Sequence, residues 1–233
     1  MKAGMILRYE NVLFDLDGTL TDSKEGIINS ILYALDKFGI TEKRPNELES
    51  FIGPPLRESF MKRYHLSNDD ADRAVLVYRE YFSDKGLYQN RVYSGIPELL
   101  QYLGHNLVRL FVATSKPTMF ATRILEHFQL DTCFDGIIGS NPDNSRTDKT
   151  DVIAHVVSKY RLNPSRSVMI GDRKHDLIGA RNNSMACIGV TWGYGSVDEI
   201  ESQQPDAIVN TVDMLGEIFA GWGEGFKRLK VEG

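Results

Sequence analysis

Short, uniformly apolar runs alternate with helix-period segments along most of this 233-residue chain. An apolar run of roughly four to eight residues, bounded by turn-forming residues, is typical of a fully buried strand. Strands of this kind are found in parallel sheets that are covered on both faces. The predicted strands are Asn11–Phe14, Arg109–Ala113, Gly136–Gly139, Ser167–Ile170, Ala186–Val190 and Ala207–Val209.

Segments with helical periodicity lie between these strands and after the last of them. Alternation of strand and helix predicts an α/β fold in which helices cover both faces of one parallel sheet. We therefore expect a Rossmann-like core of three layers. The predicted helices are Thr118–Phe128, Lys149–Tyr160, Asp176–Asn182 and Val212–Ala220, and a further helix begins near Pro97 in "YSGIPELLQYL".

The segment between residues 26 and 91 interrupts this alternation. Ile27, Ile31 and Leu35 follow the helical period, prolines break the segment twice, and it contains no convincing strand. We interpret it as a helical insertion after the first strand. The expected domains are an α/β core made of residues 1–22 and 92–233, and a small all-helical cap made of residues 23–91.

Two acidic residues follow the first predicted strand directly. In "FDLDGTLTDS", Asp15 and Asp17 lie two positions apart, with Gly18 and Thr19 next. An Asp-Gly pair alone is typical of a turn. In an open α/β sheet, however, ligands bind at the carboxyl ends of the strands. Polar residues follow two further strands and begin one helix: Thr114, Ser115 and Lys116, then Asp172 and Asp176, and Lys149.

These residue types together are suited to one kind of chemistry. Carboxylates that converge on a crevice repel one another unless a cation or a proton intervenes. Oxygen ligands suit Mg²⁺, which completes its shell with water and substrate phosphate. The Thr114 hydroxyl and the Lys149 ammonium group can hold phosphoryl oxygens, and a carboxylate can attack phosphorus to form an aspartyl phosphate. A second carboxylate can protonate the leaving group and then activate water, so we predict a phosphoryl-transfer site.

Four segments resemble, in order, the four motifs of the haloacid dehalogenase (HAD) superfamily: "FDLDGTLTDS", "VATSK", the region of Lys149 and "GDRKHD". The resemblance covers nearly the whole chain and includes a helical cap directly after the first motif. The stretches "FIGPPLRESF" and "IGVTWGYGS" are similar to the phosphoglycolate phosphatase and 5′-nucleotidase-like branch. The resemblance therefore implies an HAD-like fold and a phosphatase that depends on Mg²⁺.

The resemblance also implies a role for each matched residue, with four of them catalytic: Asp15, Asp17, Thr114 and Lys149. Asp15 would be the nucleophile and a Mg²⁺ ligand, and Asp17 would be the general acid and base, with its backbone carbonyl on the metal. Gly18, Thr114 and Ser115 would bind phosphate, and Lys149 would bind phosphate and neutralise charge. Asp172 would ligate the metal, and Asp176 would support Asp172.

Two departures from the family pattern leave the catalytic lysine open. The second motif reads Thr-Ser-Lys where relatives often have Thr-Asn-Lys, so a contact from an asparagine side chain is missing. The Lys149 motif reads "RTDKTDV" and lacks the prolines that often follow that lysine. Lys116 follows Thr114 closely and is therefore an alternative to Lys149 as the catalytic lysine.

The predicted cap contains the turn "IGPPLRES", which includes Gly53 and Arg57. This turn is either a plain connector or a substrate-specificity loop that closes over the crevice, as caps of this type do in relatives. Arg57 and Arg63 are candidate contacts for a small anionic substrate. Trp192 and Tyr194 are candidate stacking surfaces for a nucleobase, although most aromatic residues that follow a strand pack in the core or at its rim.

Composition and charge exclude several classes of protein. Hydrophobic residues make up 42% of the chain, charged residues make up 25%, and the net charge is −5. Because there is no basic tract, we expect no nucleic acid polymer as a partner. Cys133 and Cys187 lack metal-ligand spacing and are expected to be reduced thiols. With neither a transmembrane run nor a signal-peptide pattern, we expect a cytoplasmic protein without a membrane partner, as a monomer or homodimer.

The sequence thus predicts an enzyme that hydrolyses a small phosphorylated metabolite, with phosphoglycolate as the first candidate. A 5′-nucleotidase and a sugar-phosphate mutase are alternatives within the same superfamily. A dehalogenase is disfavoured, because that branch lacks the aspartate at the position of Asp17. A non-catalytic binding module is the alternative from a different class, since the fold alone does not determine function.

Overall fold

The computed structural model describes residues 9–141 and 146–219. Internal contacts divide the chain into a core unit, Met1–Leu20 with Val92–Gly233, and a helical unit, Thr21–Arg91. The chain passes between the units twice, and β2 (Thr21–Asp22) and β3 (Arg91–Val92) pair at these crossings as a two-stranded sheet. The sequence predicted no strand between residues 26 and 91, so β3 is a correction. A two-residue strand is too short to produce a periodic pattern.

The core unit contains a six-stranded sheet in the order β5-β4-β1-β6-β7-β8. Every neighbouring pair in it is parallel, which confirms the predicted α/β class. The first strand of the chain is therefore central, with a neighbour on each side. The strands are β1 (Asn11–Phe14), β4 (Arg109–Pro117), β5 (Gly136–Ser140), β6 (Ser167–Gly171), β7 (Ala186–Val190) and β8 (Ala207–Val209).

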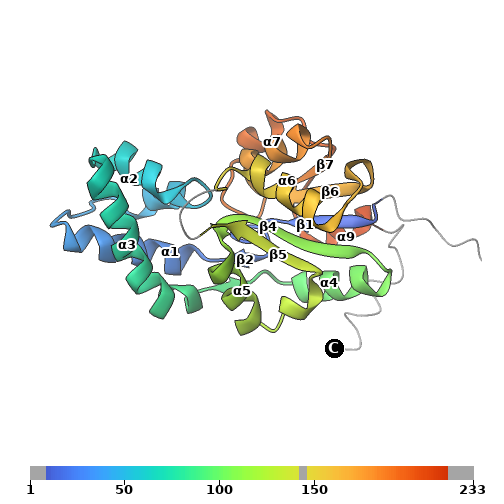
Figure 1. The fold of residues 1–233 in the computed structure, drawn as a ribbon, viewed down its shortest axis with the longest axis horizontal. Helices are drawn as coiled ribbons and strands as arrows, with labels where there is room; N and C mark the ends of the chain where they lie inside the picture. Colours follow the sequence, from blue (N-terminus) through green and yellow to red (C-terminus); the bar gives the residue numbers. More distant parts are fainter. Residues whose placement is uncertain (1–8, 142–145, 220–233) are drawn as a thin grey trace, which may run out of the picture. The chain divides into compact units, whose positions relative to one another are not determined.

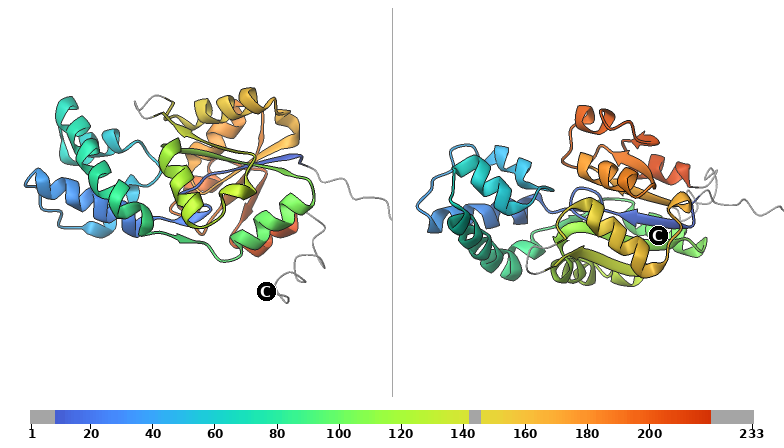
Figure 2. Two further views of the ribbon diagram at one scale, coloured as in Figure 1. Left: turned by 60° about the horizontal axis from the view of Figure 1, so that its bottom comes forward. Right: turned by 45° about the horizontal axis from the view of Figure 1, so that its top comes forward.

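Helices cover both faces of this sheet and make the predicted three layers. Figures 1 and 2 show α6 and α7 over one face and α4 and α5 over the other. The helices of the core unit are α4 (Ile96–His105), α5 (Thr118–His127), α6 (Lys149–Tyr160), α7 (Lys174–Asn182), α8 (Val197–Glu201) and α9 (Val212–Ile218), with short 3₁₀ turns η3 (Asp131–Cys133) and η4 (Pro164–Arg166).

Both faces of the central strand are buried, because successive side chains of β1 point to opposite layers. Leu13 packs with Phe111 and Met169 of the neighbouring strands under α6 and α7. Phe14 points the other way and meets the ring of Phe134 edge-on. Every residue of β1 is buried, which explains the continuous apolar run in the sequence.

Most element bounds agree with the sequence pattern, and the differences lie where polar residues follow an apolar run. β4 continues four residues beyond the predicted end at Ala113, to Pro117, with a shift of register against β5. α7 begins at Lys174 rather than Asp176, because the Asp176 carboxylate accepts the Arg173 N–H and caps the helix. α9 ends at Ile218, and the predicted end at Ala220 lies outside the described residues.

The helical unit consists of α1 (Lys24–Lys37), α2 (Leu56–Tyr64) and α3 (Asn68–Asp84), with 3₁₀ turns η1 (Pro45–Phe51) and η2 (Gly86–Tyr88). Its core is aromatic: Phe51 and Phe60 meet edge-on at 5.5 Å, and Tyr78 stacks on Phe82 at 5.3 Å. Among the described residues of both units, no helix is long and apolar enough to cross a membrane.

Glu42 connects the loop after α1 to helix α2. Its Oε2 accepts from Arg63 Nε at 2.9 Å and from the Tyr64 hydroxyl. Arg63 also binds Glu47, with Nη1 and Oε2 3.0 Å apart. These contacts, above all that with Arg63, lower the pKa of Glu42 from 4.5 to about 2. The Glu42 side chain is only 6% exposed, so the ion pair is poorly screened by solvent.

We predict that E42Q destabilises the protein at neutral pH by about 1 to 2 kcal/mol, because Arg63 and Tyr64 lose a charged acceptor. Since folding lowers the pKa of Glu42, its contribution is complete above about pH 4.5 and is lost as the pH falls towards about 2. Urea unfolding of wild type and E42Q over this range should give a difference that shrinks with acid. E80Q, an exposed change on α3, is the control, and a pH-independent difference for E42Q would contradict the charge-based explanation.

Candidate active site

The order of the strands brings the predicted site residues together. β1 lies between β4 and β6, with Phe14 opposite Val112 on one side and Ile170 on the other. The Asp15 N–H donates to the carbonyl of Ile170 at 2.9 Å, so Asp15 directly extends the strand end. Thr114 and Asp172 therefore flank Asp15 at the carboxyl edge of the sheet, where ligands bind in such folds.

Three carboxylates form the centre of this site. One oxygen from each of Asp15, Asp172 and Asp176 lies within 4.8 Å of the other two. Asp172 and Asp176 are fully buried, and Asp15 is 5% exposed. Buried carboxylates this close carry a large electrostatic cost unless cations offset their charge.

Lys149 supplies one of those cations. Its Nζ lies 2.8 Å from Asp15 Oδ1 and 2.7 Å from Asp176 Oδ1, and it donates to the carbonyl of Ala113 at 2.9 Å. Lys149 is the first residue of α6, and Asp148 caps the helix by accepting from Thr150 N. Burial alone would lower the pKa of Lys149, but Asp15 and Asp176 outweigh it and raise the pKa. Lys149 is therefore charged and fixed by three acceptors.

The single positive charge of Lys149 does not balance the negative charge of the three carboxylates. Burial, followed by the negative charges of Asp176 and Asp15, raises the pKa of Asp172 to about 8. Burial also raises the pKa of Asp176, although the Lys149 ammonium group opposes this. Such shifts mean that the carboxylates need a further proton or a further cation.

The oxygen donors fit a divalent cation. Lys149 binds two of the three buried carboxylates, so Mg²⁺ at this site would balance the remaining negative charge. A bound divalent ion would lower the pKa values of its ligands again. The sequence assigned Asp15, Asp172 and the backbone carbonyl of Asp17 as metal ligands and Asp176 as the support of Asp172. The carboxylates of Asp15, Asp172 and Asp176 all lie in the cluster.

Asp17 takes a different position from its neighbour Asp15. Its Oδ2 lies 2.9 Å from Lys116 Nζ, and its carboxylate is not one of the three in the cluster. The sequence assigned its metal contact to the backbone carbonyl rather than to the side chain. The two candidate lysines therefore have separate partners: Lys149 binds Asp15, and Lys116 binds Asp17.

The predicted phosphate-binding residues lie beside these groups in the chain. Thr114 is buried at the carboxyl end of β4, and its Oγ1 accepts from the Lys116 N–H at 3.3 Å. Ser115 is half-buried. Gly18 has a φ of 86°, and a Cβ on it would lie 2.3 Å from Asp172 Oδ2. Gly18 thus allows both the turn after Asp17 and the close approach of Asp172.

A loop that the sequence did not assign holds Asp172 in place. The Tyr194 N–H donates to Asp172 Oδ2 at 2.8 Å, while the Thr19 hydroxyl donates to Asp172 Oδ1 at 3.0 Å. Trp192 Nε1 in turn donates to the carbonyl of Thr19 at 3.1 Å. The segment after β7 therefore fixes both Asp172 and the loop that follows Asp15. We call residues 191–196 the β7 strap.

The β7 strap fits closely against the acidic cluster. A Cβ on Gly193 would lie 2.3 Å from the Gly18 carbonyl and 2.4 Å from Asp172 Oδ2. A Cβ on Gly195 would lie 1.9 Å from the Asp172 carbonyl. The sequence considered Trp192 and Tyr194 only as stacking or packing residues. The two glycines in "WGYG" could have indicated this contact from the sequence, because glycine allows a close approach of the backbone to other groups.

The predicted specificity residues lie in the helical unit. Gly53 has a φ of 103°, as expected for a tight turn before α2. Arg57 Nε lies 2.8 Å from Asp72 Oδ1, and its Nη2 donates to Asn68 Oδ1 at 2.7 Å. Both guanidinium groups that were considered for substrate binding, Arg57 and Arg63, thus have carboxylate partners within the helical unit. Their role towards substrate stays a prediction.

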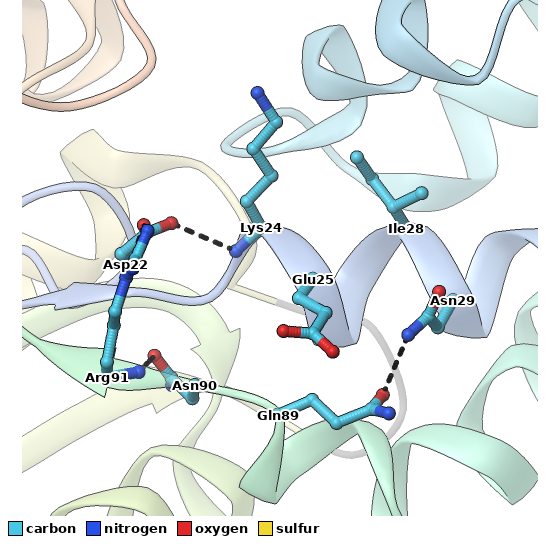
Figure 3. A pocket seen from close by; sticks show the side chains of 8 residues that line it. All are labelled: Asp22, Lys24, Glu25, Ile28, Asn29, Gln89, Asn90 and Arg91. Atoms are coloured by element: carbon cyan, nitrogen blue, oxygen red, sulfur yellow. Dashed lines mark hydrogen bonds and ion pairs between the residues drawn. The ribbon is translucent and has the colours of Figure 1, made fainter.

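The helical unit also contains a pocket of about 400 Å³ beside the start of α1 (Figure 3). Asn29 donates to Gln89 across it at 3.2 Å, and Arg91 binds Asp22 at one end. None of the site residues predicted from the sequence lines it. The lining residues are Asp22, Lys24, Glu25, Ile28, Asn29, Gln89, Asn90 and Arg91.

Comparison with known proteins shows the family of this chain. The model of the haloacid dehalogenase-like hydrolase family matches residues 12–190. A protein of Pseudomonas aeruginosa named 5′-nucleotidase is 51% identical over 199 residues, which are 85% of this chain and 90% of that protein. The family resemblance drawn from the four motifs is therefore confirmed.

Two further similarities extend the picture. A solved structure described as a predicted phosphatase from Clostridium acetobutylicum has a TM-score of 0.87 and 46% identity, covering 90% of this chain and 97% of that one. A Mycobacterium tuberculosis protein named tyrosine-protein kinase PtkA is 39% identical over 208 residues, which are 88% of this chain and 71% of that protein. These similar sequences carry names of different phosphoryl-transfer activities.

We predict that G193A weakens Mg²⁺ binding by about tenfold or more, because the added methyl group displaces Asp172 from its place beside Asp15. Calorimetric titration with Mg²⁺ measures the effect without any substrate. G104A is the matched control, since a Cβ on Gly104 meets nothing within 4 Å. Unchanged Mg²⁺ affinity in a folded G193A protein would show that the β7 strap does not position Asp172.

Proposed function

This chain belongs to the haloacid dehalogenase-like hydrolases, and from that premise we propose that it is a Mg²⁺-dependent phosphatase acting through an aspartyl phosphate. Relatives named 5′-nucleotidase and phosphoglycolate phosphatase support this proposal. The proposed mechanism rests mainly on one observation. Lys149 Nζ contacts Asp15, at the end of the central strand, and Asp176, in the first turn of α7, and both belong to the cluster of three carboxylates.

Asp15 is the proposed nucleophile. Its Oδ1 accepts from the Leu16 N–H at 2.7 Å and meets Lys149 at 2.8 Å, so these two contacts orient the carboxylate. An Asp15 oxygen forms a bond to phosphorus while the bond from phosphorus to the leaving oxygen breaks. Water then attacks the phosphorus atom, and the bond from phosphorus to the Asp15 oxygen breaks. This step releases inorganic phosphate and regenerates the Asp15 carboxylate.

Asp17 is the proposed acid and base. It gives a proton to the leaving oxygen in the first step and takes a proton from the attacking water in the second. Asp17 Oδ1 has no hydrogen-bond partner among the described residues. This oxygen is therefore available for the proton transfers, while Oδ2 is held by Lys116.

Lys149 is the proposed catalytic lysine, and Lys116 is not. Lys149 is bound to the nucleophile itself, whereas Lys116 is bound to Asp17. Thr114 and Ser115, with Gly18, are the proposed phosphate-binding groups at the same strand ends. Mg²⁺, held by Asp15 and Asp172 with the Asp17 carbonyl, would neutralise the phosphoryl oxygens in this site.

Two substrate classes follow from different observations. The sequence motifs favour phosphoglycolate, a small anion for which a compact pocket with a basic residue is needed. The relative that is 51% identical is named 5′-nucleotidase, which favours a nucleoside monophosphate. We therefore propose a small phosphomonoester and put nucleoside monophosphates first for testing, with Gly53 and Arg57 of the cap as specificity residues.

The phosphoryl acceptor distinguishes the remaining activities. A phosphatase transfers the group to water, a mutase returns it to substrate, and a kinase such as the one named in Mycobacterium transfers it to protein. Release of inorganic phosphate, measured beside isomerised product and phosphorylated protein, separates the three. A panel of phosphoglycolate, 5′-nucleotides, sugar phosphates and pyrophosphate then identifies the substrate class.

We predict that D15N lowers phosphate release with Mg²⁺ by at least about a thousandfold, because an amide cannot form the acyl phosphate. The measurement is hydrolysis of p-nitrophenyl phosphate and of the best substrate in the panel. D151N, an exposed Asp-to-Asn change on α6, is the matched control and should retain activity. Full activity of D15N would refute the mechanism, whatever the substrate.

A further inference from the structure

We propose that Lys116 is a positioning residue that holds the acid and base Asp17 in place, and thereby sets how well the enzyme expels poor leaving groups. This role rests on the proposed function, in which Asp17 transfers the protons. Lys116 Nζ lies 2.9 Å from Asp17 Oδ2. Nothing in the motif pattern assigns this contact, because the two residues are far apart in the chain.

The ion pair is largely removed from solvent. The side chain of Lys116 is 7% exposed and that of Asp17 is 12% exposed. At this degree of burial a charge pair is less screened than one on the surface, and a charge-assisted hydrogen bond fixes the carboxylate more firmly. Lys116 therefore restricts Asp17 to one orientation before substrate binds.

The two oxygens of Asp17 differ in a way that suits a proton donor. Oδ2 is held by Lys116, whereas Oδ1 is buried and has no hydrogen-bond partner in the described part of the chain. The carboxylate is thus held at one oxygen, and the other makes no hydrogen bond among the described residues. Oδ1 is the atom that would transfer the proton to the leaving oxygen as its bond to phosphorus breaks.

The backbone at Lys116 is constrained by the pairing of β4 with β5. The register between β4 and β5 shifts between Ala113 and Pro117, and such irregularities re-aim side chains next to active sites. The Lys116 N–H donates to Thr114 Oγ1 at 3.3 Å. On β5, a Cβ on Gly139 would lie 2.0 Å from the Lys116 carbonyl, so the two strands lie very close at this point.

The test compares two leaving groups on otherwise similar substrates, with wild-type protein and Mg²⁺. p-Nitrophenolate leaves without needing a proton, whereas phenolate is more basic and depends more on the acid. K116M should lower kcat/KM for phenyl phosphate by about tenfold or more and for p-nitrophenyl phosphate by less than about threefold. K116R should restore most of the lost activity, because it keeps the charge at this position. K159M, an exposed change on α6, is the matched control and should leave both rates unchanged.

A double-mutant cycle separates positioning from general damage. In a D17N background, K116M should cause no further loss with phenyl phosphate, because Lys116 acts through Asp17. Equal losses on both substrates, no loss on either, or an additional loss in D17N would each overturn the proposal. Failure of wild type to release phosphate, or full activity of D15N, would instead overturn the proposed function and this role with it.

Discussion

The architecture of the site depends on one buried lysine. Lys149 meets Asp15 after β1, Asp176 in the first turn of α7 and the Ala113 carbonyl in β4. Without that positive charge, the carboxylates at adjacent strand ends would repel one another in a poorly hydrated space. The parallel sheet concentrates acidic groups at one edge, and the lysine at the start of α6 makes that concentration tolerable. A divalent cation would balance the remaining negative charge, which together with burial raises the pKa of Asp172.

The two lysines near the site have different tasks because they have different partners. Lys149 is bound to Asp15 and Asp176, so in the proposed mechanism it acts where the phosphoryl group is transferred. Lys116 is bound to Asp17, so in the same mechanism it acts where the proton moves. Separate cations allow two aspartates only two residues apart to keep distinct chemical characters. Asp15 and Asp17 are the same residue type, so any difference in their chemistry comes from their neighbours.

Much of this was predictable from the sequence, for physical reasons. Buried parallel strands require continuous apolar runs, and the chemistry requires carboxylates directly after them, so β1, Asp15 and Asp172 were predictable. The contact between Trp192 and Thr19 was not, because a loop bond to a backbone carbonyl leaves no periodic pattern. Tyr194 contributes only its N–H to Asp172, which any residue except proline would supply. The pairing of Lys116 with Asp17 depends on side-chain direction at an irregular strand end, and a local sequence pattern does not encode this.

The β7 strap has a consequence for the order in which the site can form. The nucleophile Asp15 is synthesised near the beginning of the chain, whereas Tyr194, which holds Asp172, is synthesised after most of the core unit. During translation the central strand and its aspartates therefore emerge long before the backbone that fixes the third carboxylate. Until β7 and its strap have been synthesised, the emerging chain lacks the Tyr194 N–H that binds Asp172.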